Sequence, residues 1–470
     1  MERTNVESFL KKEITFLGLV ASFVAINIGG ALFSLTVVAG SSAGPSLPIA
    51  MLVASVPAIL ALVPYSMFST AWPTTSSTYR YSQLLSPPLA FIHMFTLLLC
   101  MLIGAEPLFA LTFGEYFNLL MPETAQINPA IIGIIVFTLF YIVNLLGIKF
   151  TTRLQIFLFL TMMAALVLFV IFGIDDVKTA NFSPLMPNGA IGFVGVIGIL
   201  FTFCAGGLFV IDLGGEVKRA AATYRRALIT GMLTVVIIYV LIHVVTVGAV
   251  NWEALKEQRT LMKVAENFMP GWAVLFFIIG GALVACATTI NGIFTIISRG
   301  MMVIAEEGLF PAFLGKVSKR FGTPHWALTF IWAVCSLSLY ILTSPMAKEM
   351  GGNPVFLFGV ITNFGLIISI TFVCIAGAVV PFQMNKVYEK SGFKISKKVV
   401  AFISGSAVFL NALILTLLLL ALQKAMGYKP AVMLGVFVLI AVITYLVSRW
   451  NMTRKGLTPP GKPTIPDTTE

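Results

Sequence analysis

Two pairs of glycines interrupt long apolar stretches of this sequence. Gly29-Gly30 lies in the stretch 24–33, and Gly206-Gly207 lies in the stretch 202–209. Inside a lipid bilayer each unsatisfied backbone amide or carbonyl is costly, so a helix weakened there needs a purpose. Small residues also let membrane helices pack closely, which is the alternative for either pair alone. Because the pairs recur at corresponding places in two halves of the chain, we favour a binding site built from main chain.

Unwound backbone at these glycines offers donors and acceptors to a small charged molecule. Free amides at Gly29, Gly30 and Ala31 suit a carboxylate at the start of a half-helix. Free carbonyls of Ala25, Ile26, Thr202 and Phe203 suit an ammonium group, and a zwitterionic amino acid satisfies both sets. The full predicted substrate site comprises Ala25, Ile26, Ile28, Gly29, Gly30, Ala31, Thr202, Phe203, Cys204, Ala205, Gly206 and Gly207.

Two adjacent hydroxyl groups, Thr288 and Thr289, lie at a depth similar to that of the first glycine pair. With the carbonyls of Ala25 and Ile28, these hydroxyls can form a cage of oxygen atoms, which is the kind of site that a sodium ion prefers. Threonines in membrane helices also bond the carbonyl four residues earlier, which is the alternative. We therefore expect either a sodium site at these four residues or ordinary helix packing.

Glu106 is the one carboxylate that lies clearly within an apolar stretch, and it precedes Pro107. A buried carboxylate is costly in a membrane, so we expect it to face a cavity. There it can attract a cationic substrate or bind a coupling proton, unless a kink at Pro107 exposes it to the outer vestibule. His243 is a second titratable group in such a stretch, although a neutral, hydrogen-bonded histidine is the more common case.

The composition sets the class of protein that must position these residues. Of the 470 residues, 58% are hydrophobic and only 10% are charged, whereas soluble domains contain about 25% charged residues. About 20 apolar residues span a bilayer, so we expect an all-α integral membrane protein with twelve transmembrane helices. The predicted spans lie near residues 14–39, 47–68, 89–113, 130–147, 154–174, 190–214, 227–250, 272–298, 326–343, 355–381, 400–422 and 431–448.

The net charge of +11 follows membrane topology and does not indicate nucleic-acid binding. If the chain starts in the cytoplasm and alternates sides, 23 of its 30 Lys and Arg residues fall in cytoplasmic segments and seven in external loops. This asymmetry obeys the positive-inside rule, so we expect a multi-pass plasma-membrane protein with both termini cytoplasmic. The five cysteines lack CxxC spacing, and we interpret them as packing residues without disulfide or metal-binding roles.

The glycine pairs lie in the first and sixth predicted spans, so two repeats of five spans each begin with a broken helix. Repeat one covers about 12–174 and repeat two about 190–381, and their odd offset gives them opposite orientations in the membrane. Two peripheral helices follow at about 400–448 in a single transmembrane domain, 1–450. Residues 451–470 form a proline-rich cytoplasmic tail. This organisation predicts an inverted five-plus-five repeat with helices 1 and 6 broken.

Several motifs in the sequence resemble those of the amino acid–polyamine–organocation (APC) permeases. The most specific lies at 298–328, where SRG, AEEGLFP and GTPHWAL occur in the order and spacing of the family's eighth span and following loop. The stretches 28–33, 69–81 and 144–155 match other family patterns, as does Gly206 with the later Glu216-Val217-Lys218. The resemblance covers roughly residues 12–390.

The resemblance implies a LeuT-type fold, amino acid transport by alternating access, and a substrate site between spans one and six. It also implies that Glu216 pairs with a basic residue of another loop and closes an inner gate, the alternative being an exposed charge. The chain departs from the family at Ala31, where a third glycine is usual, and at Gly207, where an aromatic residue is common. Met162 stands where many proton-coupled relatives carry a lysine, which leaves room for sodium or for exchange without an ion.

We therefore expect a secondary active transporter for a neutral, apolar amino acid, with sodium or a proton as coupling ion and no other cofactor. The alternatives are a transporter or exchanger of amines, polyamines or cationic amino acids that uses Glu106, and a non-transporting amino acid sensor. No sequence pattern of a membrane enzyme is present. The expected partners are the lipid bilayer and the small substrate, and the sequence does not define an oligomeric state.

Overall fold

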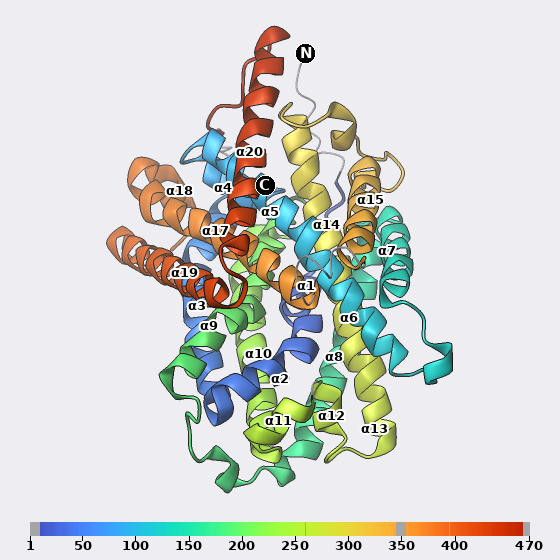
Figure 1. The fold of residues 1–470 in the computed structure, drawn as a ribbon. Coiled ribbons are helices and arrows are strands. Elements are labelled where there is room, and N and C mark those ends of the chain that lie inside the picture. The colour runs from blue at the N-terminus through green and yellow to red at the C-terminus, as the bar shows by residue number, and fades with distance from the viewer. Residues whose placement is uncertain (1–9, 259, 345–353, 394, 464–470) are drawn as a thin grey trace.

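The computed structural model describes residues 10–258, 260–344, 354–393 and 395–463, which form helices joined by loops (Figure 1). These described residues contain no β-strand, and their β-type pairing is limited to two isolated bridges, Ile14 with Val217 and Thr75 with Leu213. The prediction of an all-α protein is confirmed. Lys348 of a predicted external loop and residues 464–470 of the predicted tail lie outside the described residues.

Long apolar helices dominate the molecule. Within the described part of the chain, ten helical segments are long and apolar enough to cross a membrane, and two shorter apolar helices accompany them. This pattern is that of an integral membrane protein. The two shorter helices are α1 (Phe16–Asn27) and α7 (Pro129–Leu145). Three of the ten segments each combine two helices, namely α2 (Gly30–Ala43) with α3 (Leu47–Ala71), α5 (Pro87–Cys100) with α6 (Glu106–Asn118), and α13 (Gly271–Phe276) with α14 (Val284–Glu306). The other seven correspond to α8 (Ile148–Gly173), α9 (Gly189–Ala205), α10 (Ala220–Ala249), α15 (His325–Leu342), α17 (Pro354–Gln383), α19 (Lys397–Met426) and α20 (Lys429–Arg454).

Both glycine pairs coincide with a change of helical structure, as the sequence predicted. Helix α1 ends at Asn27, Ile28 and Gly29 leave the helical conformation, and α2 begins at Gly30. In the second case α9 ends at Ala205 and continues directly as a 3₁₀ segment, η7 (Gly206–Asp212). The first glycine pair therefore interrupts its helix, whereas at the second pair the α-helix changes to the tighter 3₁₀ form.

Two π-helical turns lie in other membrane helices. The first, η3 (Met101–Ala105), joins α5 to α6, and the second, η9 (Phe277–Leu283), joins α13 to α14. A π turn holds an extra residue, which rotates the side chains that follow, and such turns are frequent at functional sites. The turn in η3 is important here because it decides which side chains of this span reach the interior.

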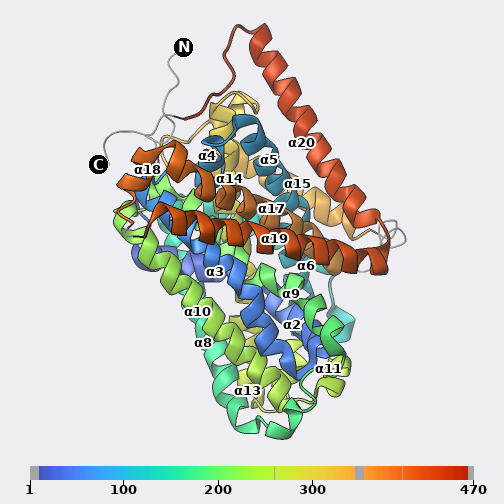
Figure 2. The same ribbon diagram turned by 90° about the vertical axis from the view of Figure 1, so that its left-hand side faces the viewer.

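Short helices lie at the two ends of the bundle (Figures 1 and 2). At one end, hereafter the α4 end, lie α4 (Ser77–Gln83) and α18 (Asn385–Lys390). The opposite end, the α11 end, carries α11 (Trp252–Gln258) and α12 (Leu261–Ala265). Figure 2 shows α20 along one edge of the molecule. Only 17% of the apolar stretch of this helix is buried within the protein. This helix therefore presents most of its apolar surface to lipid.

Candidate functional site

The start of α2 forms one wall of the candidate site. The N–H of Ile28 still donates to the Val24 carbonyl over 2.7 Å, which completes the last turn of α1. Gly29 is extended, and α2 then starts afresh at Gly30. The first amides of any helix lack carbonyl partners within that helix, and its N-terminus favours negative charge. The backbone at Gly30 and Ala31 is thus arranged to receive an anionic group.

The carbonyls at the end of α1 are not equally free. The Ala25 carbonyl accepts a hydrogen bond from Thr289 Oγ1 over 2.8 Å, and the Asn27 carbonyl accepts one from Tyr239 Oη over 2.7 Å. The Ile26 carbonyl lies beside the second break, where a Cβ added to the adjacent glycine would be 3.3 Å away. Of the two α1 carbonyls predicted to bind an ammonium group, Ile26 is therefore better placed than Ala25.

The second glycine pair brings its span close to α1. A Cβ added at Gly207 would lie 2.3 Å from Asn27 Nδ2 and 2.6 Å from the Phe23 carbonyl oxygen. The N–H of Gly207 donates to Asn27 Oδ1 over 2.8 Å. At Gly206 the added atom would be 3.1 Å from Ile26 Cγ2. Gly207 thus serves close helix packing, which was the alternative raised from the sequence. It does not line the cavity described next.

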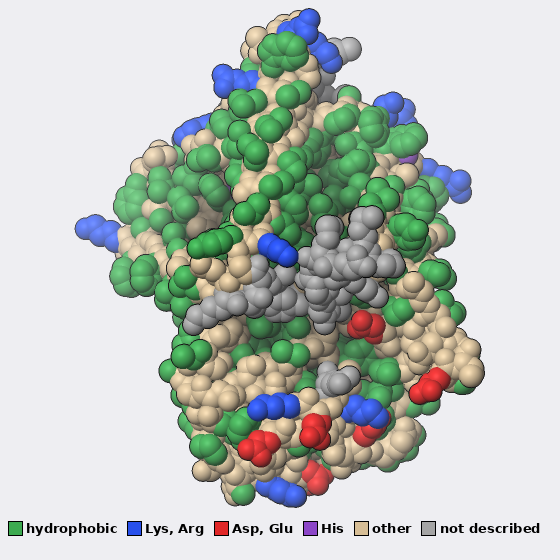
Figure 3. Space-filling view, in the orientation of Figure 1, with side chains coloured by type: hydrophobic (Ala, Val, Ile, Leu, Met, Phe, Trp, Pro, Cys, Tyr) green, Lys and Arg blue, Asp and Glu red, His purple; other side chains and the backbone are tan. Residues whose placement is uncertain are grey.

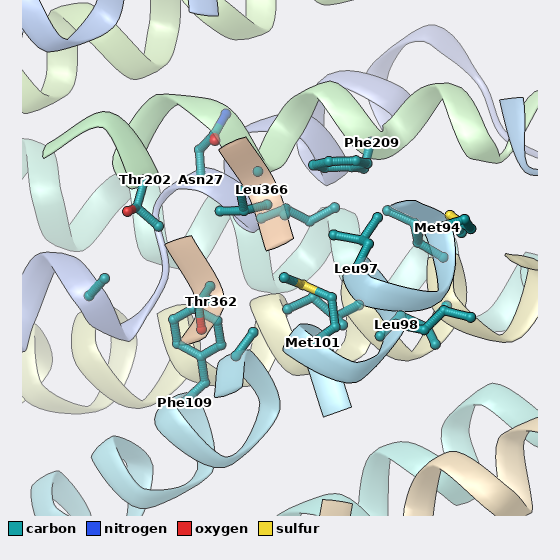
Figure 4. Close-up of a pocket in the computed structure, with 17 residues that line it drawn as sticks. Asn27, Met94, Leu97, Leu98, Met101, Phe109, Thr202, Phe209, Thr362 and Leu366 are labelled. Carbon is teal, nitrogen blue, oxygen red and sulfur yellow. The ribbon is translucent and has the colours of Figure 1, made fainter. Parts of the chain in front are cut away.

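A narrow cavity lies between the two breaks (Figure 4). Helices α5, α6, α14 and α17 complete its wall, together with η3 and η7. Figure 4 shows polar Asn27, Thr202 and Thr362 toward one side, whereas the opposite side is formed by apolar side chains. These apolar side chains include Met94, Leu97, Leu98 and Phe209. The cavity is therefore polar near the helix breaks and apolar beyond them.

Four residues of the predicted substrate site line this cavity, namely Ile26, Ala31, Thr202 and Gly206. The Thr202 hydroxyl is hydrogen-bonded to Asn363 Oδ1 of α17, which links span six to this helix. The other predicted residues are buried but do not line it. They are Ala25, Ile28, Gly29, Gly30, Phe203, Cys204, Ala205 and Gly207.

Close contacts explain why Gly29 and Gly30 sit behind the cavity wall. A Cβ added at Gly29 would lie 2.6 Å from Thr289 Oγ1 and 2.9 Å from the Phe109 ring. At Gly30 it would lie 2.6 Å from Cys286 Sγ. No side chain fits at either position, so these glycines can contribute only their backbone.

The two threonines of the predicted sodium site behave differently. Thr289 Oγ1 donates to the Ala25 carbonyl over 2.8 Å and lies 2.9 Å from the Ala285 carbonyl. Thr288 Oγ1 donates to the Ala285 carbonyl over 2.8 Å, within its own helix. The structure therefore brings Thr289 and Ala25 together, but both threonines also contact the Ala285 carbonyl of their own helix, Thr289 by the bond across four residues that was the alternative.

Glu106 is fully buried but is not a lining residue of the cavity. Its neighbours Ala105 and Phe109 line the wall, whereas Glu106 lies close enough to Cys335 of α15 for an electrostatic interaction. Neither carboxyl oxygen has a hydrogen-bond partner among the described residues. The buried His243 likewise has both ring nitrogens without such a partner, and it packs near Phe203.

Glu216 and Arg299 form a bidentate ion pair in the interior. Arg299 Nε donates to Glu216 Oε2 and Arg299 Nη2 donates to Oε1, each over 2.9 Å. The side chains are 1% and 0% exposed. Arg299 belongs to the SRG motif of α14, so this pair joins the two most characteristic motifs of the sequence. Glu216 is accordingly not an exposed surface charge.

Backbone pairing closes the α4 end beside this ion pair. The N–H groups of Glu13 and Ile14 donate to the Glu216 carbonyl over 2.9 Å, and Lys218 N–H donates to the Ile14 carbonyl over 2.8 Å. A salt bridge of 3.2 Å joins Lys218 to Glu13, and its hydrogen bond lowers the pKa of the Glu13 carboxyl. The segment before α1 is thus fastened to the segment after η7.

Sequence reasoning missed Asn27 and much of the cavity wall as site residues. Asn27 bridges the breaks, since its Oδ1 accepts from Gly207 and its carbonyl from Tyr239. The sequence feature that could have identified Asn27 is a lone side-chain amide next to a glycine pair in an apolar stretch. Met101 and Phe209 carried no signal, because their types are ordinary in membrane helices and only the fold aims them inward.

Comparison with known proteins agrees with this geometry. The family model for amino acid permeases matches residues 14–448. The methylthioribose transporter of Bacillus subtilis is 28% identical over 329 residues, which are 66% of this chain and 70% of that protein. The branched-chain amino acid permease BcaP of Bacillus subtilis is 23% identical over 71% of this chain and 76% of its own.

A plant protein extends the range of relatives. The vacuolar cationic amino acid transporter 4 of Arabidopsis thaliana is 27% identical over 73% of this chain and 60% of its own length. The names of these relatives describe different solutes, so they define a family and not a substrate. With a family match that spans almost its whole length, this chain belongs to the amino acid permeases of the APC superfamily.

Proposed function

We propose that this permease is a secondary transporter that moves a neutral, apolar amino acid across the plasma membrane by alternating access. The observation that carries the proposal is the cavity between the two helix breaks, which is polar on one side and apolar on the other. Ligand sites are typically concave and apolar with a few polar groups that fix orientation. A zwitterion with an apolar side chain is complementary to this distribution.

The substrate's charged ends are assigned to the breaks. We assign its carboxylate to the start of α2, where the helix dipole favours negative charge. Ala31 lines the cavity there, and Gly29 and Gly30, which lie directly behind the wall, offer only their backbone amides. The substrate's ammonium group donates to the Ile26 carbonyl and to Thr202 Oγ1. This mode uses main-chain groups for the constant part of an amino acid, as in transporters with broken helices.

The substrate's side chain is assigned to the apolar part of the cavity. Met94, Leu97, Met101 and Phe209 offer a wall without hydrogen-bonding groups. A cationic side chain would lose its hydration there without gaining a partner, which is unfavourable. Because Glu106 does not line the cavity, it supports an amine or cationic substrate less well than the sequence alone suggested.

We assign the α4 end to the cytoplasm, with both termini on that side and twelve spans arranged as an inverted five-plus-five repeat. Figure 3 shows Lys and Arg side chains around the upper part of the molecule, whereas in the lower part they are mixed with the Asp and Glu side chains visible on this face. This distribution is what the positive-inside rule requires. The ion pair of Glu216 with Arg299 then acts as an inner gate that must separate when the cavity opens to the cytoplasm.

For energy coupling we propose sodium at Ala25, Ile28, Thr288 and Thr289. The contact of Thr289 Oγ1 with the Ala25 carbonyl supports this choice, because two of the predicted oxygen ligands already face each other across α14 and α1. A small separation of these helices would admit an ion between the oxygens. Proton coupling at the buried Glu106 is the alternative, and a dependence of uptake on pH without a dependence on sodium would favour it.

The test is uptake of radiolabelled amino acids into liposomes that contain the purified protein, with and without a sodium gradient. We expect saturable uptake of leucine, isoleucine or methionine, and little competition by lysine or putrescine. The variant Ala31→Leu fills the cavity wall and should abolish uptake, whereas Thr124→Ala on an exposed loop should not. Uptake of cationic compounds alone would overturn the substrate class, and binding without uptake would indicate a sensor.

A further inference from the structure

A second buried carboxylate, Asp212, lies at the last residue of η7, away from the substrate cavity. Asp212 is fully buried. Oδ1 accepts the N–H of Thr78 over 2.5 Å. Oδ2 has no hydrogen-bond partner among the residues that the structure describes. Half of the acceptor capacity of this carboxylate is therefore unused in a place without access to bulk water.

The basic side chains at the α4 end do not neutralise Asp212. Arg299 is paired with Glu216, Arg80 with Glu307 over 2.6 Å, and Lys218 with Glu13. Within the described ranges, Asp212 takes part in no ion pair with a protein cation. A buried charge without compensation is strongly unfavourable. Either a bound proton or a cation beside the carboxylate can offset this cost.

Uncompensated oxygen atoms surround the same carboxylate. The buried hydroxyls of Ser76 and Tyr65 have no hydrogen-bond partner in the described part of the chain, and the Thr78 hydroxyl lies within reach of the Asp212 carboxylate. The N–H of Ser76 donates to the Asp212 carbonyl over 2.9 Å, which holds the loop before α4 against η7. Tyr65 of α3 lies close enough to Asp212 for an electrostatic interaction. Hydroxyl groups of α3 and of the start of α4 thus lie in the neighbourhood of this carboxylate.

We propose that Asp212 is the centre of a buried binding site for a monovalent cation. Asp212 Oδ2 and the hydroxyl oxygens of Ser76 and Thr78 are the ligands, and the Tyr65 hydroxyl is the next oxygen available. Hard cations prefer oxygen donors of this kind, and the single carboxylate balances a single positive charge. The site is separate from the one proposed at Thr289, which involves α1 and α14.

The bound cation would fasten the inner half of span six to the loop that precedes α4. This loop and η7 also meet through the bridge between Thr75 and Leu213. If the protein transports by alternating access, as proposed above, the cation favours the conformation that is closed at the α4 end. The consequence for transport rests on that proposed function, whereas cation binding itself does not.

Thermal unfolding of the purified full-length protein tests the site without any amino acid present. Sodium chloride and potassium chloride are compared with choline chloride at equal ionic strength and constant pH. We expect one of the two metal ions to raise Tm saturably above the value in choline, because a ligand that binds only the folded state stabilises it. The variant Asp212→Asn keeps an acceptor for Thr78 N–H and should lose this rise.

Two further variants make the result decisive. Thr78→Val removes one hydroxyl ligand with little change of shape and should weaken the cation dependence even if Asp212→Asn does not fold. Thr289→Val removes any rise that comes from the other proposed ion site, so the rise that remains in this variant is the one assigned to Asp212. The proposal is overturned if Tm is the same in all three salts, or if the rise that remains in Thr289→Val survives when Asp212→Asn is added to it. Loss of transport with an intact cation response would count only against the proposed function.

Discussion

At the scale of single residues, the two adjacent glycines of span six have different surroundings. In Gly207→Ala the new methyl group would meet Asn27 Nδ2 at 2.3 Å and the Phe23 carbonyl oxygen at 2.6 Å. Since backbone cannot move aside cheaply, the span must shift from α1, and overpacking of this kind costs about 1–3 kcal/mol. We expect a lowered Tm and impaired uptake. Gly206→Ala, with its nearest contact at 3.1 Å, should destabilise less, and equal effects would contradict this assignment.

The sequence identified the position of these glycines but not their individual roles. Breaks at Gly29 and Gly206 were predictable, because a glycine pair in an apolar stretch is unfavourable without a use. Whether a missing side chain leaves room for a ligand or for another helix depends on the facing residue. Here that residue is Asn27, and its contact with Gly207 results from the tertiary arrangement of α1 against η7. The role of Gly207 in helix packing was therefore beyond what the sequence alone could support.

At the scale of helices, the pair of Glu216 with Arg299 connects η8 (Gly214–Glu216) to α14. Glu216→Gln leaves the guanidinium of Arg299 buried and unpaired, which typically costs about 3–5 kcal/mol. We expect a clear fall in Tm. Joint replacement by Glu216→Gln and Arg299→Met removes both charges and should recover much of the stability. If the pair is a gate, this double variant should remain folded but show altered transport kinetics.

Matched controls separate the pair's charge from its position. Lys263→Gln breaks an exposed salt bridge with Glu266 and should change Tm little, since such pairs are screened by water. Arg299→Lys keeps the charge but loses the bidentate geometry, so an intermediate effect is expected. A fall in Tm with Lys263→Gln as large as with Glu216→Gln would show that charge loss in general, and not this contact, sets stability.

The π turn η3 explains why the orientation of Glu106 was hard to foresee. One residue of an α-helix corresponds to a rotation of about 100°, so an additional residue in a turn redirects every side chain after it. The expectation that Glu106 faces a cavity rested on the cost of burying a carboxylate in a membrane. In the structure Ala105 lines the cavity and Glu106 does not. Patterns of apolar residues do not reveal a π turn, because both kinds of turn bury similar side chains.

At the scale of the whole molecule, composition and charge distribution were sufficient for the protein class. The apolar stretches and the glycine pairs were readable from local sequence, and they agree with the helices observed. The cavity and the surroundings of Asp212 were not readable, since each combines residues from helices far apart in the chain. Asp212 and Ser76, for example, meet only because η7 lies against the loop before α4.

The proposed topology can be tested with single cysteines, because all five native cysteines are buried. Thr124→Cys and Lys319→Cys each place a thiol on an exposed loop residue, and the two loops belong to opposite sides in the proposed arrangement. A membrane-impermeant maleimide added to intact cells should label Thr124→Cys and leave Lys319→Cys unlabelled until the membrane is permeabilised. The unmodified protein, which should stay unlabelled, is the control. Labelling in the reverse order would invert the orientation, and labelling of both in intact cells would contradict the predicted number of spans between them.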